Sequence, residues 1–296
     1  MELWATGFNA WGQLDFQGES SLAPADLRTF KCILRSKHLE MLRTSLSATL
    51  VRTSSGIKAA GSLDAVFQLC LTQKDGFRKV AIAGNEKFAE TQGKFIKEYR
   101  SLKSYIDGDG HHLGEFECFE QIAANQTTFT ALSKNGKVWT WGDGRYESCL
   151  GREVSEETPA QLPSIVKDLS DLPTGPIRKI SSGGYVTAAL TSGNDLYLWG
   201  GCPGQSKILD QFSGMPEPID LDGQDVLDVA VGADHILALT TEHRLYVVGA
   251  NRNGQLGLDV KELSELGEIA LPLGGKQIVS VHAGYKNSFL LVEDIT

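Results

Sequence analysis

The clearest pattern in the chain is a pair of apolar runs separated by a short polar turn. Residues 235–240 (HILALT) and 244–249 (RLYVVG) form its best example, and a glycine-rich segment, residues 251–257 (NRNGQLG), follows directly. Apolar runs that break at a tight turn are typical of a β-hairpin. Because one short hairpin cannot bury both of its faces, the pattern predicts that copies of this unit stack on one another.

Further copies of the hairpin occur along the chain. Residues 125–142 (NQTTFTALSKNGKVWTWG) and 183–200 (GGYVTAALTSGNDLYLWG) keep both runs and the turn, while residues 44–61 and 83–99 keep the rhythm with fewer recurring residues. The aligned copies begin at Thr44, Ala83, Asn125, Gly183, Gly232 and Gly284. A repeat of roughly 40–50 residues is that of a four-stranded propeller blade. The count predicts six blades, and seven remain possible in the longer spacings.

The remaining copy is divided between the two ends of the chain. Residues 284–292 supply a first run, whereas residues 3–7 (LWATG) and 9–14 (NAWGQL) supply the second half. A ring of blades has one blade divided between the two ends of the chain if the last strands pair with the first. We therefore predict one all-β domain over residues 1–296, a β-propeller closed by pairing of the N- and C-terminal strands. The apolar spacing leaves a helix open near residues 24–34 or 37–43.

The recurring residues resemble the repeat of the regulator-of-chromosome-condensation family, the RCC-type repeat. The fullest match comprises Gly232, His235, the triplet 238–240 (ALT), Gly249 and the loop 251–257. The two middle copies match well, the terminal halves fairly, and the copies near residues 44 and 83 poorly. The resemblance implies a β-propeller, usually of seven blades, in which the first and last strands share a blade.

Charge narrows the class of partner. The chain has 37 acidic and 28 basic residues, which gives a formal net charge of −9. Nucleic-acid binding depends on Lys and Arg that neutralise phosphates, so direct nucleic-acid binding is not expected. The balance favours a protein partner of basic character, with acidity for solubility alone as the other interpretation. Three acidic groups fall in expected rim segments: Glu153/Glu156/Glu157, Asp220/Asp222/Asp225 and Glu262/Glu265/Glu268.

The cysteines and the apolar runs bear on the compartment. The five cysteines are odd in number and form no CxxC pair, which argues against a disulfide framework and a zinc knuckle. The first residues lack a basic segment followed by an apolar one, and no apolar run approaches the ~20 residues of a membrane span. We expect a cytoplasmic or nuclear protein without a membrane segment, present as a monomeric propeller in a hetero-complex.

The sequence offers little for catalysis. It lacks the nucleophile elbow, the phosphate-binding glycine loops and the HExxH zinc motif. Residues 107–112 (DGDGHH) start like a calcium loop but lack its full register, so we interpret them as a solvated loop. His235 is expected to form a hydrogen bond between strands. Trp4, Trp139, Trp141 and Trp199 are expected to pack between blades. We predict no enzyme activity, no cofactor and no metal.

The loops after the second run of each hairpin are the candidate binding surface. They hold six aromatic, arginine or asparagine residues of the kind that anchor protein interfaces: Phe8, Trp11, Arg145, Tyr146, Arg252 and Asn253. We therefore predict a non-catalytic scaffold or adaptor subunit that binds a protein partner. The family resemblance implies complexes for tRNA wobble-uridine or diphthamide modification, or partnership with a chromatin-modifying oxygenase. It also implies the alternative, guanine-nucleotide exchange on a small GTPase.

Overall fold

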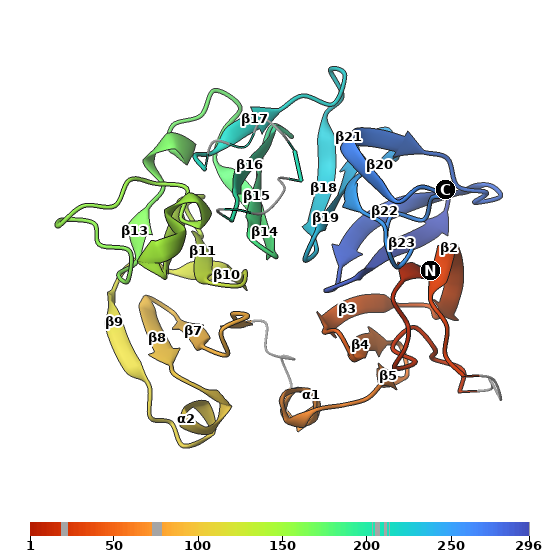
Figure 1. The fold of residues 1–296 in the computed structure, drawn as a ribbon, viewed down its shortest axis with the longest axis horizontal. Coiled ribbons are helices and arrows are strands. Elements are labelled where there is room, and N and C mark those ends of the chain that lie inside the picture. Colours follow the sequence, from red (N-terminus) through yellow and green to blue (C-terminus); the bar gives the residue numbers. More distant parts are fainter. Residues whose placement is uncertain are drawn as a thin grey trace. The chain divides into compact units, whose positions relative to one another are not determined.

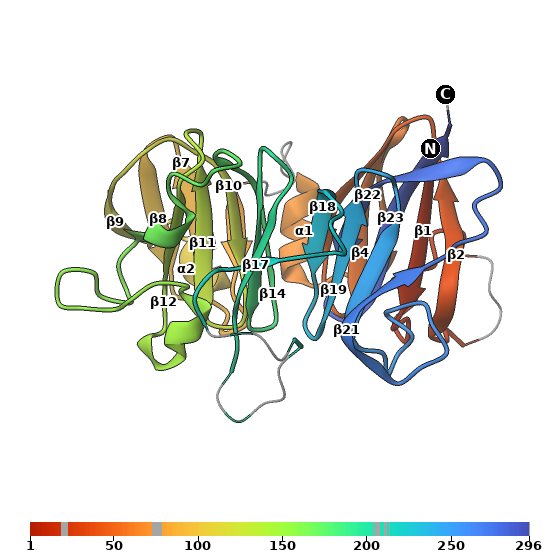
Figure 2. The same ribbon diagram turned by 90° about the horizontal axis from the view of Figure 1, so that it is seen from above.

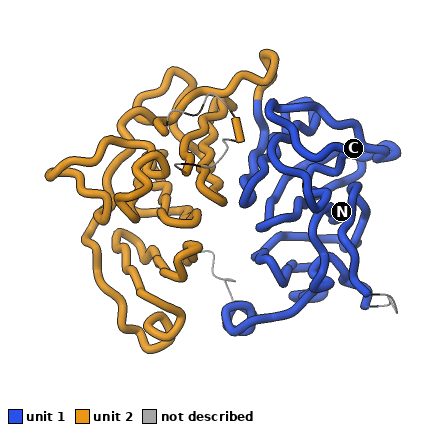
Figure 3. The backbone as a smooth tube through the Cα atoms, in the orientation of Figure 1, with its two compact units in different colours: residues 1–76, 226–296 blue, residues 77–225 orange. Residues whose placement is uncertain are grey.

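A computed structural model describes residues 1–18, 23–72, 79–202, 204, 208–209, 212 and 214–295. In this part of the chain 23 strands form six antiparallel sheets, one of three strands and five of four (Figure 1). The chain divides into two compact units (Figure 3). Unit 1 comprises residues 1–76 and 226–296, and unit 2 comprises residues 77–225. Each unit contains three of the sheets.

Unit 1 contains the sheet in which both ends of the chain meet. Its strand order is β2-β1-β23-β22, and these strands run side by side in Figures 1 and 2. The bounds are β1 (Glu2–Gly7), β2 (Leu27–Arg35), β22 (Lys276–Ala283) and β23 (Asn287–Asp294). The strands β1 and β23 pair in register from Glu2 opposite Val292 to Gly7 opposite Asn287. The predicted pairing of N- and C-terminal strands is thus confirmed.

The other two sheets of unit 1 have the same up-and-down order. One is β3 (Leu39–Thr44), β4 (Ala48–Thr53) and β5 (Gly56–Gly61), and the next is β18 (Val226–Val231), β19 (His235–Thr240), β20 (Leu245–Ala250) and β21 (Glu262–Ile269). The helix α1 (Ala65–Thr72) follows β5 and buries Phe67 and Cys70. Asp64 accepts a hydrogen bond from the backbone N–H of Phe67 at 3.0 Å and so begins this helix.

Unit 2 repeats this arrangement three times. Its first sheet is β6 (Val80–Ile82), β7 (Phe88–Gln92), β8 (Phe95–Tyr99) and β9 (His111–Glu115), with α2 (Leu102–Ile106) between the last two strands. The second is β10 (Phe119–Ala124), β11 (Thr128–Ser133), β12 (Val138–Gly142) and β13 (Ser164–Ile165), with 3₁₀ helices at Gly144–Cys149 and Lys167–Leu169. The third is β14 (Ile177–Gly183), β15 (Val186–Thr191), β16 (Leu196–Gly200) and β17 (Glu217–Ile219).

Every predicted hairpin corresponds to the second and third strands of a sheet. This holds for the poorly matching copies too, which form β4–β5 and β7–β8. The six sheets confirm the count of six in the described residues. The two segments left open for a helix are strands instead, β2 and β3, because each pairs along its length with a neighbouring strand. That residues 1–296 form one domain stays a prediction.

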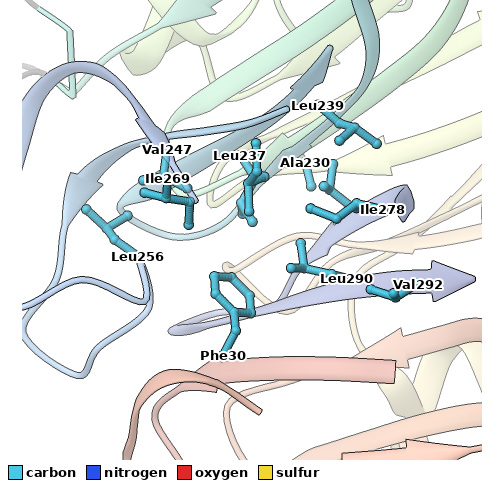
Figure 4. Close-up of a cluster of buried hydrophobic side chains, with 12 residues drawn as sticks. Phe30, Ala230, Leu237, Leu239, Val247, Leu256, Ile269, Ile278, Leu290 and Val292 are labelled. Carbon is cyan, nitrogen blue, oxygen red and sulfur yellow. The ribbon is translucent and has the colours of Figure 1, made fainter. Parts of the chain in front are cut away.

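The apolar core lies between neighbouring sheets within each unit. In unit 1 one cluster joins residues of β19 and β20, such as Leu237 and Val247, to Leu290 of β23 and Phe30 of β2 (Figure 4). In unit 2 the fully buried Trp141 and Trp199 belong to clusters shared by adjacent sheets. Trp4 and Trp139 pack against such clusters as well. The prediction for the four tryptophans is confirmed.

Candidate partner-binding loops

Four of the six predicted binding residues belong to two loops of unit 1. Phe8 and Trp11 follow β1, while Arg252 and Asn253 follow β20. Both loops carry the pattern N-x-x-G-Q-L, at residues 9–14 and 251–256. We use "loop face of unit 1" for these two loops together with the turns at residues 45–47 and 284–286.

The asparagine of the pattern closes each loop. Asn9 accepts a hydrogen bond from the Leu14 N–H at 2.8 Å, and Asn251 accepts one from the Leu256 N–H at 2.8 Å. Each asparagine also donates to backbone carbonyls nearby, Asn251 to Leu258 at 2.7 Å. Such side-chain bonds replace the backbone ladder that a loop lacks. The recurring asparagine therefore fixes loop shape.

The glutamine of the pattern is fully buried in both loops. Gln13 accepts from the Trp11 N–H at 3.1 Å and donates to the carbonyls of Phe8 and Leu46, each at 2.9 Å. Gln255 accepts from the Asn253 N–H at 2.9 Å and donates to the carboxylate of Asp234 at 3.1 Å. These bonds tie the exposed loop residues to the sheets below.

Asp26 joins the two loops, and Lys286 joins the first of them to the β22–β23 turn. The carboxylate of Asp26 accepts from the Asn9 N–H at 3.0 Å and from the Asn253 side-chain amide at 2.9 Å. The Phe8 N–H donates to the Lys286 carbonyl at 2.8 Å. The structure thus brings together the four residues predicted in unit 1.

Two apolar residues of the loop face were not predicted from the sequence. Leu46, in the β3–β4 turn, and Tyr285, in the β22–β23 turn, are each 42% exposed, and Trp11 is 54% exposed. A single apolar residue in a polar turn contributes to no periodic pattern, so sequence periodicity does not identify it. The available signal was its position, because both turns lie at the start of a predicted hairpin copy, directly before that hairpin's first strand.

The other two predicted residues lie in unit 2, after β12. Arg145 donates to the carboxylate of Asp143, with an Nη2–Oδ2 distance of 2.6 Å, and this pair lowers the pKa of Asp143. The ring of Tyr146 stacks on that of Tyr185, with centroids 5.5 Å apart. The Arg145 side chain is 82% exposed. This second loop surface therefore combines the stacked Tyr146 and Tyr185 rings with the exposed guanidinium of Arg145.

His235 lies in an arrangement that resembles a catalytic triad in composition. Its Nε2 is 3.0 Å from the hydroxyl of Ser288, and its Nδ1 is 3.6 Å from the Asp234 carboxylate. The predicted bond between strands is confirmed, since Ser288 belongs to β23. Both His235 and Ser288 are 0% exposed, and the hydroxyl donates to the Gln255 carbonyl at 2.6 Å. A buried hydroxyl whose proton is already donated elsewhere is a poor nucleophile.

Other candidate chemistry is dispersed. Residues 107–112 (DGDGHH), whose first residues resemble a calcium loop, connect a helix to a strand. Asp107 caps the C-terminus of α2, and His111 begins β9. Within the described ranges no three His, Cys, Asp or Glu residues are grouped to hold a metal ion.

All five cysteines are free thiols, and burial raises the pKa of Cys149 to about 11. No helix in this part of the chain has the length and apolar character needed to cross a bilayer.

The sheets and their connections define an all-β protein of the propeller class, built from repeated up-and-down blades. Residues 135–190 and 226–255 match family models described as the regulator of chromosome condensation (RCC1) repeat. The RCC1 domain-containing protein RUG3, mitochondrial, of Arabidopsis thaliana is 31% identical over 180 residues, which cover 58% of this chain and 39% of that protein. The first curated relatives are covered over only 3% to 39% of their length.

Solved structures show the same fold. Human WBSCR16 superimposes with a TM-score of 0.59 at 18% identity, over 98% of this chain and 82% of that one. Yeast RCC1 (Prp20), solved with Kap60, gives a TM-score of 0.61 at 15% identity, over 99% and 76% of the two chains. The chain thus contains two segments that match the RCC1 repeat, and it has the β-propeller fold of these structures.

Proposed function

We propose that this chain is a non-catalytic adaptor subunit that binds a protein partner through the loop face of unit 1. The observation that carries the proposal is the exposure of Trp11, Leu46 and Tyr285 on loops fixed by buried hydrogen bonds. Large apolar side chains on a rigid surface are typical anchors of protein interfaces. Binding of a protein is also what the solved complex of yeast RCC1 (Prp20) with Kap60 reports for that relative.

The environment of His235 supports a structural role at this face. Its ring and Ser288 are completely buried, so a substrate would have to displace core side chains to reach them. The distance of 3.6 Å between Nδ1 and the Asp234 carboxylate exceeds that of a good hydrogen bond. The three side chains hold adjacent strands and the loop 251–257 together.

Acidic side chains on β21 support a partner of basic character. Glu262 and Glu265 are exposed and form no ion pair among the described residues, whereas Glu268 pairs with Arg244 at 3.5 Å. Free carboxylates near an apolar interface raise the association rate of a basic partner and impose a salt dependence. We place the complex among those that the family resemblance implies, for chromatin, tRNA or diphthamide modification, and the protein in the cytoplasm or nucleus.

The test is affinity capture with identification of bound proteins, at low and high salt. Wild type is compared with W11A and Y285A, and with I106A as a control, because Ile106 is 61% exposed on α2 in unit 2. We expect a stoichiometric partner that W11A and Y285A lose and I106A retains. Equal capture by W11A and wild type would contradict the proposal.

Guanine-nucleotide exchange is distinguished in the same experiment. Captured small GTPases are loaded with labelled nucleotide, and its release is followed with and without the purified chain. Faster release that W11A abolishes would favour exchange over the adaptor function. Release that is unchanged, together with capture of another class of protein, is the result the adaptor proposal predicts.

A further inference from the structure

We propose that Gln13 is the positioning residue of the loop face: it holds the Trp11 loop against the Leu46 turn, so that an apolar side chain of the partner contacts both anchors together. This inference rests on the proposed function and specifies how its surface is organised. Trp11 follows β1, and Leu46 lies between β3 and β4, so the two anchors come from different sheets. The Gln13 side chain bonds to both residues.

The contacts of Gln13 use its whole amide group. The oxygen accepts from the Trp11 N–H at 3.1 Å, and the nitrogen donates to the Phe8 and Leu46 carbonyls at 2.9 Å each. The residue is 0% exposed, so water does not compete for these bonds. A buried amide with three partners fixes the relative position of the segments that it joins.

The neighbouring sheet is shaped to receive this residue. Gly61, the last residue of β5, has φ +89°. A Cβ at this position would clash first with the Ser47 carbonyl oxygen in the β3–β4 turn, and it would lie 2.9 Å from the Cα and Cβ of Gln13. A side chain there would push both the turn and the Trp11 loop away from β5. Glycine at this position therefore permits the loop and the Leu46 turn to meet.

Gln255 provides the comparison within the same molecule. It occupies the matching position of the second loop and is also 0% exposed. Its partners, the Asn253 N–H and the Asp234 carboxylate, lie in the loop and the turn of one sheet, β18–β21. Gln255 thus braces a loop on its own sheet, whereas Gln13 joins loops of two sheets and two exposed apolar anchors.

Loss of the Gln13 bridge is expected to weaken binding more than it weakens the fold. Ordering a loop or a side chain on binding costs conformational entropy, and a preorganised surface avoids this cost. With two anchors released, we expect about a tenfold loss of affinity. Methionine has the length of glutamine but forms none of these bonds, so Gln13→Met is the informative change.

The probe is a peptide selected on the wild-type protein from a phage-displayed library of random dodecapeptides, and kept if W11A weakens its binding. Its affinity is measured for wild type, Q13M, Q13L and Q121M. Gln121 is the control because its side chain also joins two sheets, β10 and β14, but lies in unit 2 outside the loop face. The protein is also labelled with 5-fluorotryptophan, and the Trp11 ¹⁹F resonance is assigned with W11F. We expect Q13M to bind about tenfold more weakly and to change the Trp11 resonance, and Q121M to bind within about twofold of wild type.

Q13L also forms none of these bonds and brings no charge into the buried site, whereas a glutamate would place an unpaired carboxylate against two carbonyl oxygens. We expect Q13L to weaken binding as Q13M does, which covers the case in which Q13M fails to fold. Wild-type affinity in the folded Gln13 variants, or an equal loss in Q121M, would overturn the positioning role while leaving the proposed function intact. Failure to select any peptide sensitive to W11A would contradict the proposed function itself.

Discussion

At the residue scale, buried polar side chains fix the position of the loops that carry the candidate binding residues. The backbone N–H groups of the exposed Trp11 and the half-buried Asn253 donate to buried glutamines at 3.1 and 2.9 Å. The motif around these glutamines could be predicted from the sequence as a repeated loop. Its exposed neighbours Leu46 and Tyr285 could not, because a residue's accessibility in a turn depends on packing that no local pattern records.

Glu2 gives a prediction at this scale. The carboxylate lies 2.6 Å from Lys276 Nζ and 2.8 Å from Arg35 Nε, and it accepts from the Trp4 indole at 2.8 Å. These hydrogen bonds, that of Lys276 foremost, lower the pKa of Glu2 to about 2 from 4.5. A lowered pKa contributes stability that is complete above pH 4.5 and is lost as the pH falls toward 2.

We therefore expect E2Q to be less stable than wild type by about 3 kcal/mol at pH 7, with the difference shrinking between pH 4.5 and 2. Urea unfolding of both proteins across this range measures it. E40Q is a matched control, because Glu40 pairs with Arg52 in the same unit at 3.0 Å and the two side chains are 26% and 27% exposed. A difference that does not depend on pH would show that Glu2 acts through packing alone.

At the element scale, a glycine at or next to the end of the third strand explains why most hairpin copies share a sequence ending. Gly142 has φ +157°, and a Cβ there would lie 2.5 Å from the Thr127 carbonyl oxygen in the preceding turn. Gly249 has φ +111° and faces the Asp234 carbonyl in the same way. The sequence predicted these strand ends well. It did not decide between helix and strand for β2 and β3, whose conformation depends on pairing with distant strands, and α1 and α2 were not predicted.

The close approach at Gly249 predicts a large effect of one methyl group. G249A should lower the free energy of unfolding by about 2 kcal/mol or more, from the unfavourable positive φ and the clash with Asp234. G56A is the control, since Gly56 also has positive φ (+123°) but nothing lies within 4 Å of its Cβ position. Chemical denaturation measures the free energy of unfolding of both variants. An equal decrease in both would show that the clash with Asp234 makes no contribution.

At the scale of the whole molecule, the ends of the chain are held in one sheet. This was predicted from a repeat divided between the termini, and the register from Glu2–Val292 to Gly7–Asn287 confirms it. Leu3 is 0% exposed and packs in a cluster with Phe289 of β23 and Val51 of β4. The first strand, β1, thus buries an apolar side chain against the last strand, β23.

We predict that L3A destabilises unit 1 by about 2–5 kcal/mol, as expected for a leucine removed from a packed core. Amide hydrogen exchange should accelerate in β23 and β1 of the variant. Exchange in β15 of unit 2 serves as the internal reference, because β15 belongs to another sheet and another unit. Uniform acceleration in both units would indicate a single cooperative unfolding unit instead.

The most direct test of the adaptor proposal is site-specific photo-crosslinking in cells. A benzophenone amino acid replaces Trp11, which is 54% exposed on the loop face, or Ile106, which is 61% exposed in unit 2. The proposal predicts one discrete protein adduct from position 11, reduced by Y285A in the same chain, and no matching adduct from position 106. An identical adduct from both positions, or one from position 106 alone, would contradict binding through the loop face of unit 1.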